Sequence, residues 1–221
     1  MDLKLNEFEC RLLGVLMEKE LSQPDYYPMT LNATVAACNQ KQNRDPVMSL
    51  DEVATEAGLA SLQAKDLVTM IYPGSGSRVR RYRHEAEKTL GWQKPERAVM
   101  AELLVRGPQT VGELRTRCQR FVQFADLEAV SQVLDRLSQL DPPMAEALPR
   151  QPGQTVIRHR QLITDAPDVQ PQPSIEVSPA PTPAVPQERT GDWRTEVADL
   201  RQELEDVKRR LSLLEQRQAL E

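Results

Sequence analysis

The sequence predicts a mostly helical protein made of two tandem winged helix-turn-helix domains with small β-hairpin wings, followed by a C-terminal coiled-coil helix. Three observations predict this class. Aromatic residues make up only 4% of the 221 residues, so leucine, valine, alanine and methionine must build the core, which favours helices. An order of three helices and a hairpin occurs twice. A heptad repeat then occupies the final segment.

The first helix is predicted to run from Asn6 to about Lys19. Asn6 and Glu9 have the spacing of a capping box, in which each side chain bonds the backbone N–H of the other residue. Leu5 and Cys10 are placed to pack as a hydrophobic staple around this start. The residues expected to face the core at helical spacing are Phe8, Leu12, Val15 and Leu16.

Two further helices are predicted before the first hairpin. The second begins near Thr30 and ends before the turn residues 43–46. The third opens at Ser49, where Glu52 completes another capping box. Gly58 lies inside this helix and weakens it by about 1 kcal/mol relative to alanine. The core-facing residues of the third helix are expected to be Val53, Ala57, Ala60 and Ala64.

A β-hairpin follows these three helices. Apolar and β-branched residues fill 67–72, and the sequence PGSGS at 73–77 supplies the turn. The sequence RVRRYR at 78–83 forms the returning strand. Three helices followed by a two-stranded hairpin are typical of a winged helix-turn-helix, in which the hairpin is the wing.

The same order recurs in residues 91–164. Pro95 suits the first turn of a helix that ends at Gly107. Thr110 opens a third capping box and Asp126 is placed to cap the next helix. The second hairpin is predicted from the segments 144–148 and 155–163, with turn residues at 149–154.

The remaining sequence differs in composition. Residues 165–190 are rich in proline, serine and glutamine and contain few large apolar side chains, which predicts an extended linker. The predicted organisation is therefore a winged helix over 1–90, a second over 91–164, a linker over 165–190 and a coiled-coil helix over 191–221.

Apolar residues in the segment 191–221 alternate in steps of four and three. The heptad places Val197, Leu204 and Leu211 at a, and Leu200, Val207 and Leu214 at d. The pairs that a parallel dimer would bring together have opposite charges: Glu196 with Arg201, Glu203 with Lys208, and Arg210 with Glu215. The pattern predicts a homodimer joined through this segment. The alternative is a single solvated helix with intrachain ion pairs.

Composition narrows the function classes. The net charge of −5 excludes a strongly basic DNA coat protein, but it allows a nucleic-acid binder with a local basic patch. The three cysteines are far apart, which predicts small buried side chains and neither a disulfide framework nor a zinc site. The absence of a long apolar run and of a signal-peptide pattern predicts a cytoplasmic protein without a membrane span.

Basic residues gather on the two predicted wings. The arginines concerned are Arg78, Arg80, Arg81 and Arg83 on the first wing, and Arg150, Arg158 and Arg160 on the second. A guanidinium on a narrow β-ribbon reaches a phosphate or a minor groove, so this clustering favours an anionic partner such as DNA. The alternative is that charged side chains protect an edge strand from aggregation.

The helices that would read DNA bases fit that function less well. The third helix begins with Asp51, Glu52 and Glu56, which repel phosphates. The further candidates for backbone contact are Lys41 and Arg44 in the preceding turn, and Arg115 and Arg117 in the second domain.

The sequence contains no recognisable catalytic set. The two histidines, His84 and His159, have no cysteine, aspartate or serine at a spacing typical of a nucleophile–base pair or a metal site. The glycines at 74–76 belong to a hairpin turn and are not a phosphate loop. We therefore expect no enzymatic activity, no cofactor and no metal.

Several stretches resemble the YceH family of uncharacterised bacterial proteins. They are NEFECRLLGVLMEKEL at 6–21, YYPMTLNATVAACNQ at 26–40, CNQKQNRDPVM at 38–48, GSRV at 76–79 and LLVRGPQTVGELRTR at 103–117. The resemblance covers residues 1–163 and implies two tandem winged-helix domains with no known activity, linked to DNA and transcription only through the fold. The sequence departs from the family pattern at 54–67, which weakens base reading by the third helix.

The stretch 38–48 is rich in amides and turn-forming residues. In a structural interpretation, Asn39 and Asn43 bond their own backbone and Asp45 caps a helix. In a functional interpretation, the stretch is a surface for a partner. The sequence leaves both open.

Two functions follow as hypotheses. The first is a dimeric DNA-binding protein, such as a transcriptional regulator, that uses the basic wings on DNA and the segment 191–221 to pair two chains. The second is a protein-interaction scaffold in which the winged helices are docking modules. Arginines that form ion pairs with neighbouring acidic side chains would favour the second hypothesis over the first.

Overall fold

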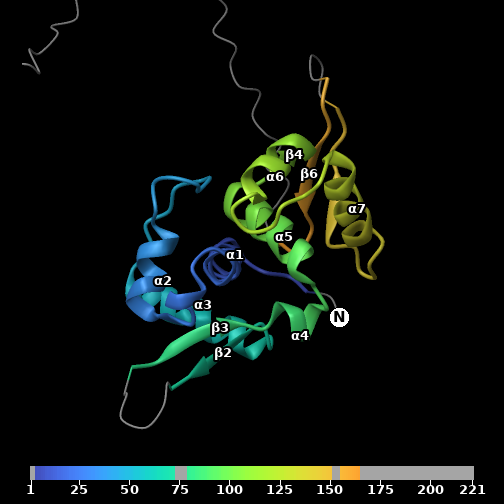
Figure 1. Cartoon of the computed structure of the whole chain (residues 1–221). Helices are drawn as coiled ribbons and strands as arrows, with labels where there is room; N and C mark the ends of the chain where they lie inside the picture. The colour runs from blue at the N-terminus through green and yellow to red at the C-terminus, as the bar shows by residue number, and fades with distance from the viewer. Residues whose placement is uncertain (1–2, 73–78, 151–154, 165–221) are drawn as a thin grey trace, which may run out of the picture. The chain divides into compact units, whose positions relative to one another are not determined.

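The computed structural model describes residues 3–72, 79–150 and 155–164. The first half of this part, residues 3–90, contains α1 (Glu7–Ser22), η1 (Pro24–Tyr26), β1 (Met29–Thr30), α2 (Leu31–Cys38), α3 (Glu52–Ala64), β2 (Val68–Ile71), β3 (Arg81–His84) and α4 (Ala86–Leu90). The second half, residues 91–164, contains α5 (Lys94–Arg106), β4 (Gln109–Thr110), α6 (Val111–Cys118), α7 (Leu127–Ser138), β5 (Ala145–Ala147) and β6 (Arg158–Gln161). The prediction of a mostly helical chain with small antiparallel sheets is confirmed (Figure 1).

The two halves repeat one topology. Each has a three-stranded antiparallel sheet, in the order β1-β3-β2 in the first half and β4-β6-β5 in the second. The two predicted hairpins are β2–β3 and β5–β6, in which Thr69 pairs with Arg83 and Glu146 with Arg160. The third strands, β1 and β4, are only two residues long, and their sequences carry no alternating pattern that would predict them.

Side chains cap the N-terminal ends of α1, α2, α3, α6 and α7. The predicted capping box of Asn6 and Glu9 is present at α1, and the box that Thr110 opens is present at α6. Asp126 caps α7 as predicted, because its side chain accepts the N–H of Ala129. The predicted start of α3 is wrong: Asp51, not Ser49, is the N-cap.

The predicted orientation of α3 is also wrong. Its buried residues are Thr55, Gly58, Leu59 and Leu62, whereas Val53, Ala57, Ala60 and Ala64 are exposed. Gly58 faces α1. A Cβ at this position would collide with the side chain of Leu12, so the two helices can lie this close because position 58 has no side chain. The glycine that weakens the helix is thus the residue that lets it approach α1.

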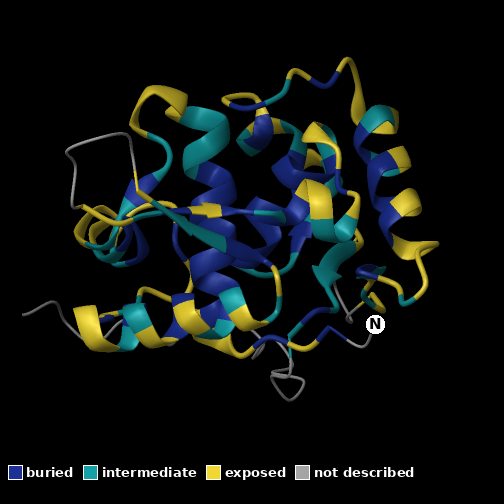
Figure 2. Ribbon diagram, turned by 90° about the horizontal axis from the view of Figure 1, so that it is seen from below, coloured by how far each residue is buried: buried dark blue, intermediate teal, exposed yellow. Residues whose placement is uncertain are grey.

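The core of both halves is centred on the contact between α1 and α5. Gly14 of α1 makes this contact close, since a Cβ there would lie 2.8 Å from Cβ of Leu104 and 2.9 Å from Cγ1 of Val105. Figure 2 shows the buried residues gathered in one central region. Phe8 was expected in this core, but its side chain faces outward and is 48% exposed, because it precedes the stretch of α1 that is enclosed.

The described residues belong to one compact unit. The predicted boundary at residue 90 coincides with the end of α4, but the core continues across it from one repeat to the other. The start of the first half also reaches the end of the second, where the Leu5 N–H donates to the Ile163 carbonyl at 2.7 Å and Leu5 forms a parallel bridge with Thr164. The predicted linker 165–190 and coiled coil 191–221, with all six of its a and d residues, lie outside the described residues.

All three cysteines are buried and free, as the sequence predicts. Burial raises the pKa of Cys10, Cys38 and Cys118 to about 12 in each case. No helix of the described part is long and apolar enough to cross a membrane.

The buried thiols should resist alkylation in the folded protein. A pKa near 12 instead of 9 lowers the thiolate fraction at neutral pH about a thousandfold, and the thiolate is the reacting form. We expect iodoacetamide at pH 7.5 to leave the native protein unmodified and to add three groups in urea, as measured by intact mass. Rapid modification without denaturant would contradict the packing of α1, α2 and α6.

Candidate interaction surface

Arginines of the first predicted wing form ion pairs with glutamates of the same half. Arg80 pairs with Glu56 of α3 at 2.9 Å, and Arg83 pairs with Glu85 at 2.8 Å. Arg81 is half-buried and donates to the Pro28 carbonyl at 2.8 Å, which supports the turn before β1. Arg78 lies outside the described residues.

The second wing follows the same pattern. Arg158 donates to Glu113 at 3.1 Å and to the Pro108 carbonyl at 3.0 Å. Arg160 pairs with Glu146 on the neighbouring strand at 2.6 Å. Arg150 precedes the turn and is exposed. The two wings therefore present alternating charges along most of their described length, not a continuous basic stripe.

The other predicted contacts are dispersed. Lys41 is exposed in the loop before α3. Arg115 donates to the Ala125 carbonyl at 3.0 Å, and Arg117 donates to Gln109 at 2.6 Å, so both hold the second half together. Arg117 also lies 3.7 Å from the Glu113 carboxylate that Arg158 of the second wing contacts, so these two arginines are brought together around one acid. No hydrogen bond or ion pair among the described residues joins Lys41 or Arg115 to a wing arginine.

Arg44 is not a surface residue. Its side chain is 0% exposed and pairs with the buried Glu18 of α1. Arg120 joins the same cluster by donating to Glu18 at 2.8 Å and to Glu102 at 2.7 Å. The expectation that Arg44 touches a DNA backbone is therefore wrong for this conformation, because a phosphate contact would require breaking a buried ion pair. A lone arginine among turn residues gives no sign of such burial.

The loop 39–51 connects α2 to α3 and contacts α5 of the second half. The Asn39 side chain donates to the Leu50 carbonyl and accepts the Leu50 N–H, at 2.7 and 2.8 Å, so the loop is closed across its base. The Asp45 N–H donates to the Val105 carbonyl at 2.9 Å, and Asn43 accepts a hydrogen bond from Arg106. The stretch makes structural contacts, but the predicted ones are wrong: Asn39 bonds the distant Leu50, and Asp51, not Asp45, caps the next helix.

The outward face of α3 combines small apolar and acidic side chains. Val53 is 78% exposed and is followed along the same side by Ala57, Ala60 and Ala64. Glu52 lies beside Val53 at the exposed start of the helix. We call these residues, 52–64 at their exposed positions, the α3 face.

Large apolar side chains are exposed at corresponding places in both halves. In the first half, Tyr72 and Val79 are exposed at the ends of the two described segments of the predicted wing. In the second half, Leu127 at the start of α7 is 51% exposed, and Val156 and Ile157 are exposed before β6. A third helix and a wing thus expose apolar surface twice in one chain. Exposed apolar side chains mark a protein-binding surface where they form a contiguous patch.

The two histidines differ in what they contact. His84 is buried, its Nε2 lies 2.9 Å from Glu20, and its Nδ1 accepts the Ala86 N–H at 3.2 Å. Burial lowers the pKa of His159. No group of histidine, cysteine, aspartate and glutamate side chains in the described ranges is arranged to hold a metal ion.

Comparison with known proteins places the chain in a family. Residues 5–154 match the family model described as "Protein of unknown function, DUF480". A UPF0502 protein of Geotalea daltonii is 50% identical over 184 residues, which cover 83% of this chain and 82% of the relative. The chain belongs to the UPF0502 family, which is the YceH family.

Other YceH-family relatives match over similar or greater lengths. A UPF0502 protein of Geobacter sulfurreducens is 49% identical over 169 residues, which cover 76% of each chain. A UPF0502 protein of Citrifermentans bemidjiense is 42% identical over 223 residues, covering 94% of this chain and 98% of the relative. The resemblance read from the motifs is thereby confirmed, and the matched residues include the α3 face.

Proposed function

We propose that this YceH-family chain is a non-enzymatic adaptor whose described part consists of two winged helices in tandem, and that it docks a protein on the α3 face. The observation that carries the proposal is the exposed apolar and acidic character of that face. The exposed side chains of Val53 and Ala57 offer apolar area to a partner, while Glu52 would repel phosphates.

The ion pairs of the wings support a protein partner over DNA. Arg80 and Arg83 each form an ion pair with a glutamate carboxylate, which reduces the positive potential that would steer a polyanion. A protein partner with basic residues around an apolar anchor fits the α3 face better, because its charges complement Glu52.

DNA binding is the second candidate, as part of transcriptional regulation. Lys41 and Arg150 are exposed cations, and surface ion pairs such as Arg80–Glu56 contribute about 1 kcal/mol or less, so a phosphate could displace the glutamate. In either case we propose a cytoplasmic protein that forms homodimers through residues 191–221.

Site-specific photocrosslinking tests the docking proposal. With a benzoylphenylalanine at Ala57, irradiated cells should yield one discrete protein adduct of the full chain, and the same group at the exposed Lys88 of α4 should yield none. Adding Val53→Glu and Ala60→Glu to the Ala57 chain should reduce the adduct at least tenfold, because both place charge on the apolar stripe. Circular dichroism of the variants checks that both chains are folded.

A measurement of DNA affinity gives the result that would contradict the adaptor proposal. Fluorescence anisotropy with random-sequence duplex DNA should show weak binding that changes less than twofold when Arg78, Arg80, Arg81 and Arg83 are replaced by alanine. A tenfold loss of affinity with a flatter salt dependence, together with no protein adduct at Ala57, would reject the adaptor and support the DNA-binding candidate.

A further inference from the structure

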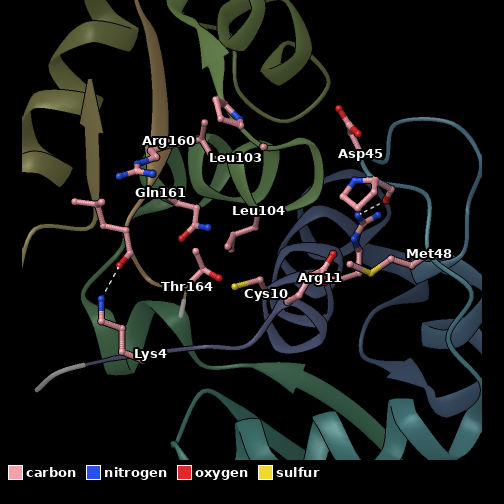
Figure 3. Close-up of a pocket in the computed structure, with 15 residues that line it drawn as sticks. Lys4, Cys10, Arg11, Asp45, Met48, Leu103, Leu104, Arg160, Gln161 and Thr164 are labelled. Carbon is pink, nitrogen blue, oxygen red and sulfur yellow. Dashed lines mark hydrogen bonds between the residues drawn. The ribbon is translucent and has the colours of Figure 1, made fainter. Parts of the chain in front are cut away.

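A cavity of about 600 Å³ lies where the two halves meet. Its walls come from α1, the loop 39–51, the end of α5 and the residues around β6 (Figure 3). Met48, Leu103, Leu104 and Leu162 supply apolar surface. Cavities of this size with apolar walls and a few polar groups are typical of small-molecule sites.

One buried cation lines this cavity without a carboxylate partner. Arg11 is 1% exposed, and its Nη2 donates to the Pro46 carbonyl at 2.6 Å. Its Nε and Nη1 make no hydrogen bond, and no ion pair joins Arg11 to an acid within the described residues. Burial and the neighbouring Arg44 lower the pKa of Arg11, which reflects the cost of holding this charge without a counterion.

The remaining charges around the cavity restrict what could pair with Arg11. Two more cations line the cavity: Lys4 donates to the Leu162 carbonyl, and Arg160 is paired with Glu146 at 2.6 Å (Figure 3). Glu7 and Asp45 are exposed at the wall and would oppose a ligand of high negative charge. Together these groups favour a single anionic group on a largely apolar body. Cys10 also lines the cavity, and its pKa of about 12 makes a covalent reaction of its thiol unfavourable.

We propose that this cavity binds a monocarboxylate with an apolar chain, held by its carboxylate on Arg11 and by its chain against Leu103, Leu104 and Met48. A turn of the guanidinium away from the Pro46 carbonyl exposes the bidentate edge that a carboxylate prefers. The ligand would contact α1 of the first half together with α5 of the second, and would therefore stabilise their packing. This site is separate from the α3 face and does not depend on the proposed docking.

Calorimetric titration of the full chain with octanoate tests the site. Octanamide is the matched neutral probe, because it has the same chain and no charge. We expect saturable one-to-one binding of octanoate with an affinity at least tenfold higher than that of octanamide, and no measurable binding of inorganic phosphate. Equal affinities for octanoate and octanamide, or tight phosphate binding, would overturn the proposal.

Variants and a residue-resolved measurement identify the position. Arg11→Met keeps the length of the side chain and should reduce octanoate affinity to that of octanamide, whereas Arg136→Met on the exposed side of α7 should leave it unchanged. If Arg11→Met does not fold, methyl spectra of the wild-type chain decide the question. Octanoate should shift the Met48, Leu103 and Leu104 methyl signals but not those of Leu59 or Leu134; shifts elsewhere or none would overturn the assignment.

Discussion

Replacing Gly14 by valine is expected to destabilise the protein strongly. The new Cβ would lie within 3 Å of Leu104 and Val105, and both belong to the neighbouring helix α5, which cannot shift without opening the core of both halves. Overpacking of this kind costs about 3 kcal/mol. We expect the midpoint of thermal unfolding to fall by roughly 6 to 12 °C, as measured by circular dichroism.

Gly112 provides the matched control. It lies in α6, and a Cβ at that position meets nothing within 4 Å. Gly112→Ala should therefore stabilise the protein by up to about 1 kcal/mol, because alanine restricts the unfolded chain and favours helix. If Gly14→Val and Gly112→Ala had equal effects, the close contact of α1 and α5 would be wrong.

Removing the Glu18 carboxylate is expected to have the second large effect. Glu18→Leu leaves Arg44, whose side chain is 0% exposed, and Arg120 without this counterion. Breaking one side of a buried ion pair costs about 3–5 kcal/mol, since the remaining charge stays desolvated. Urea unfolding of the full chain, followed by circular dichroism, measures this loss.

Two further variants separate burial from simple loss of an ion pair. Glu56→Leu removes the exposed pair with Arg80 and should cost about 1 kcal/mol or less. The double variant Glu18→Leu with Arg44→Leu should recover part of the loss, because no unpaired charge remains at Arg44. A double variant that is less stable than Glu18→Leu alone would show that Arg44 acts through packing and not through its charge.

Local signals in the sequence predicted most of the helices and both hairpins. The capping boxes at Asn6 and Thr110 could be recognised because they depend on residues only three positions apart. The strands β1 and β4 could not, since two residues carry no periodicity and their pairing depends on distant strands.

The candidate site was harder to predict because it depends on tertiary contacts. Val53, Ala57, Ala60 and Ala64 have the spacing of a buried face, and the sequence alone cannot tell that Gly58 turns the opposite side toward Leu12. The apolar residues expected to build the core are instead exposed, on the face that we propose as a docking surface. A glycine inside a predicted helix is the signal that could have indicated this: the side of the helix that carries the glycine can pack closely against another helix.

The surface charge around the wing arginines was hard to predict for a related reason. Their number on the wings can be read from the sequence, but the acids that answer them are up to 45 positions away, as for Arg158 and Glu113. Arg44 illustrates the extreme case, where the partner on α1 is 26 positions earlier and both groups are buried. Charge clustering along a sequence therefore says little about the potential at the surface.

The bridge between Leu5 and Thr164 has a consequence for synthesis on the ribosome. The residues beside it that contact each other, Lys4 and Leu162, are 158 positions apart. At about 5–20 residues per second, roughly 8 to 32 s pass between the translation of one and the translation of the other. Throughout that interval the nascent amino-terminal segment lacks its bridge partner Thr164. Chaperones that recognise short apolar stretches therefore have time to bind the segment before the bridge forms.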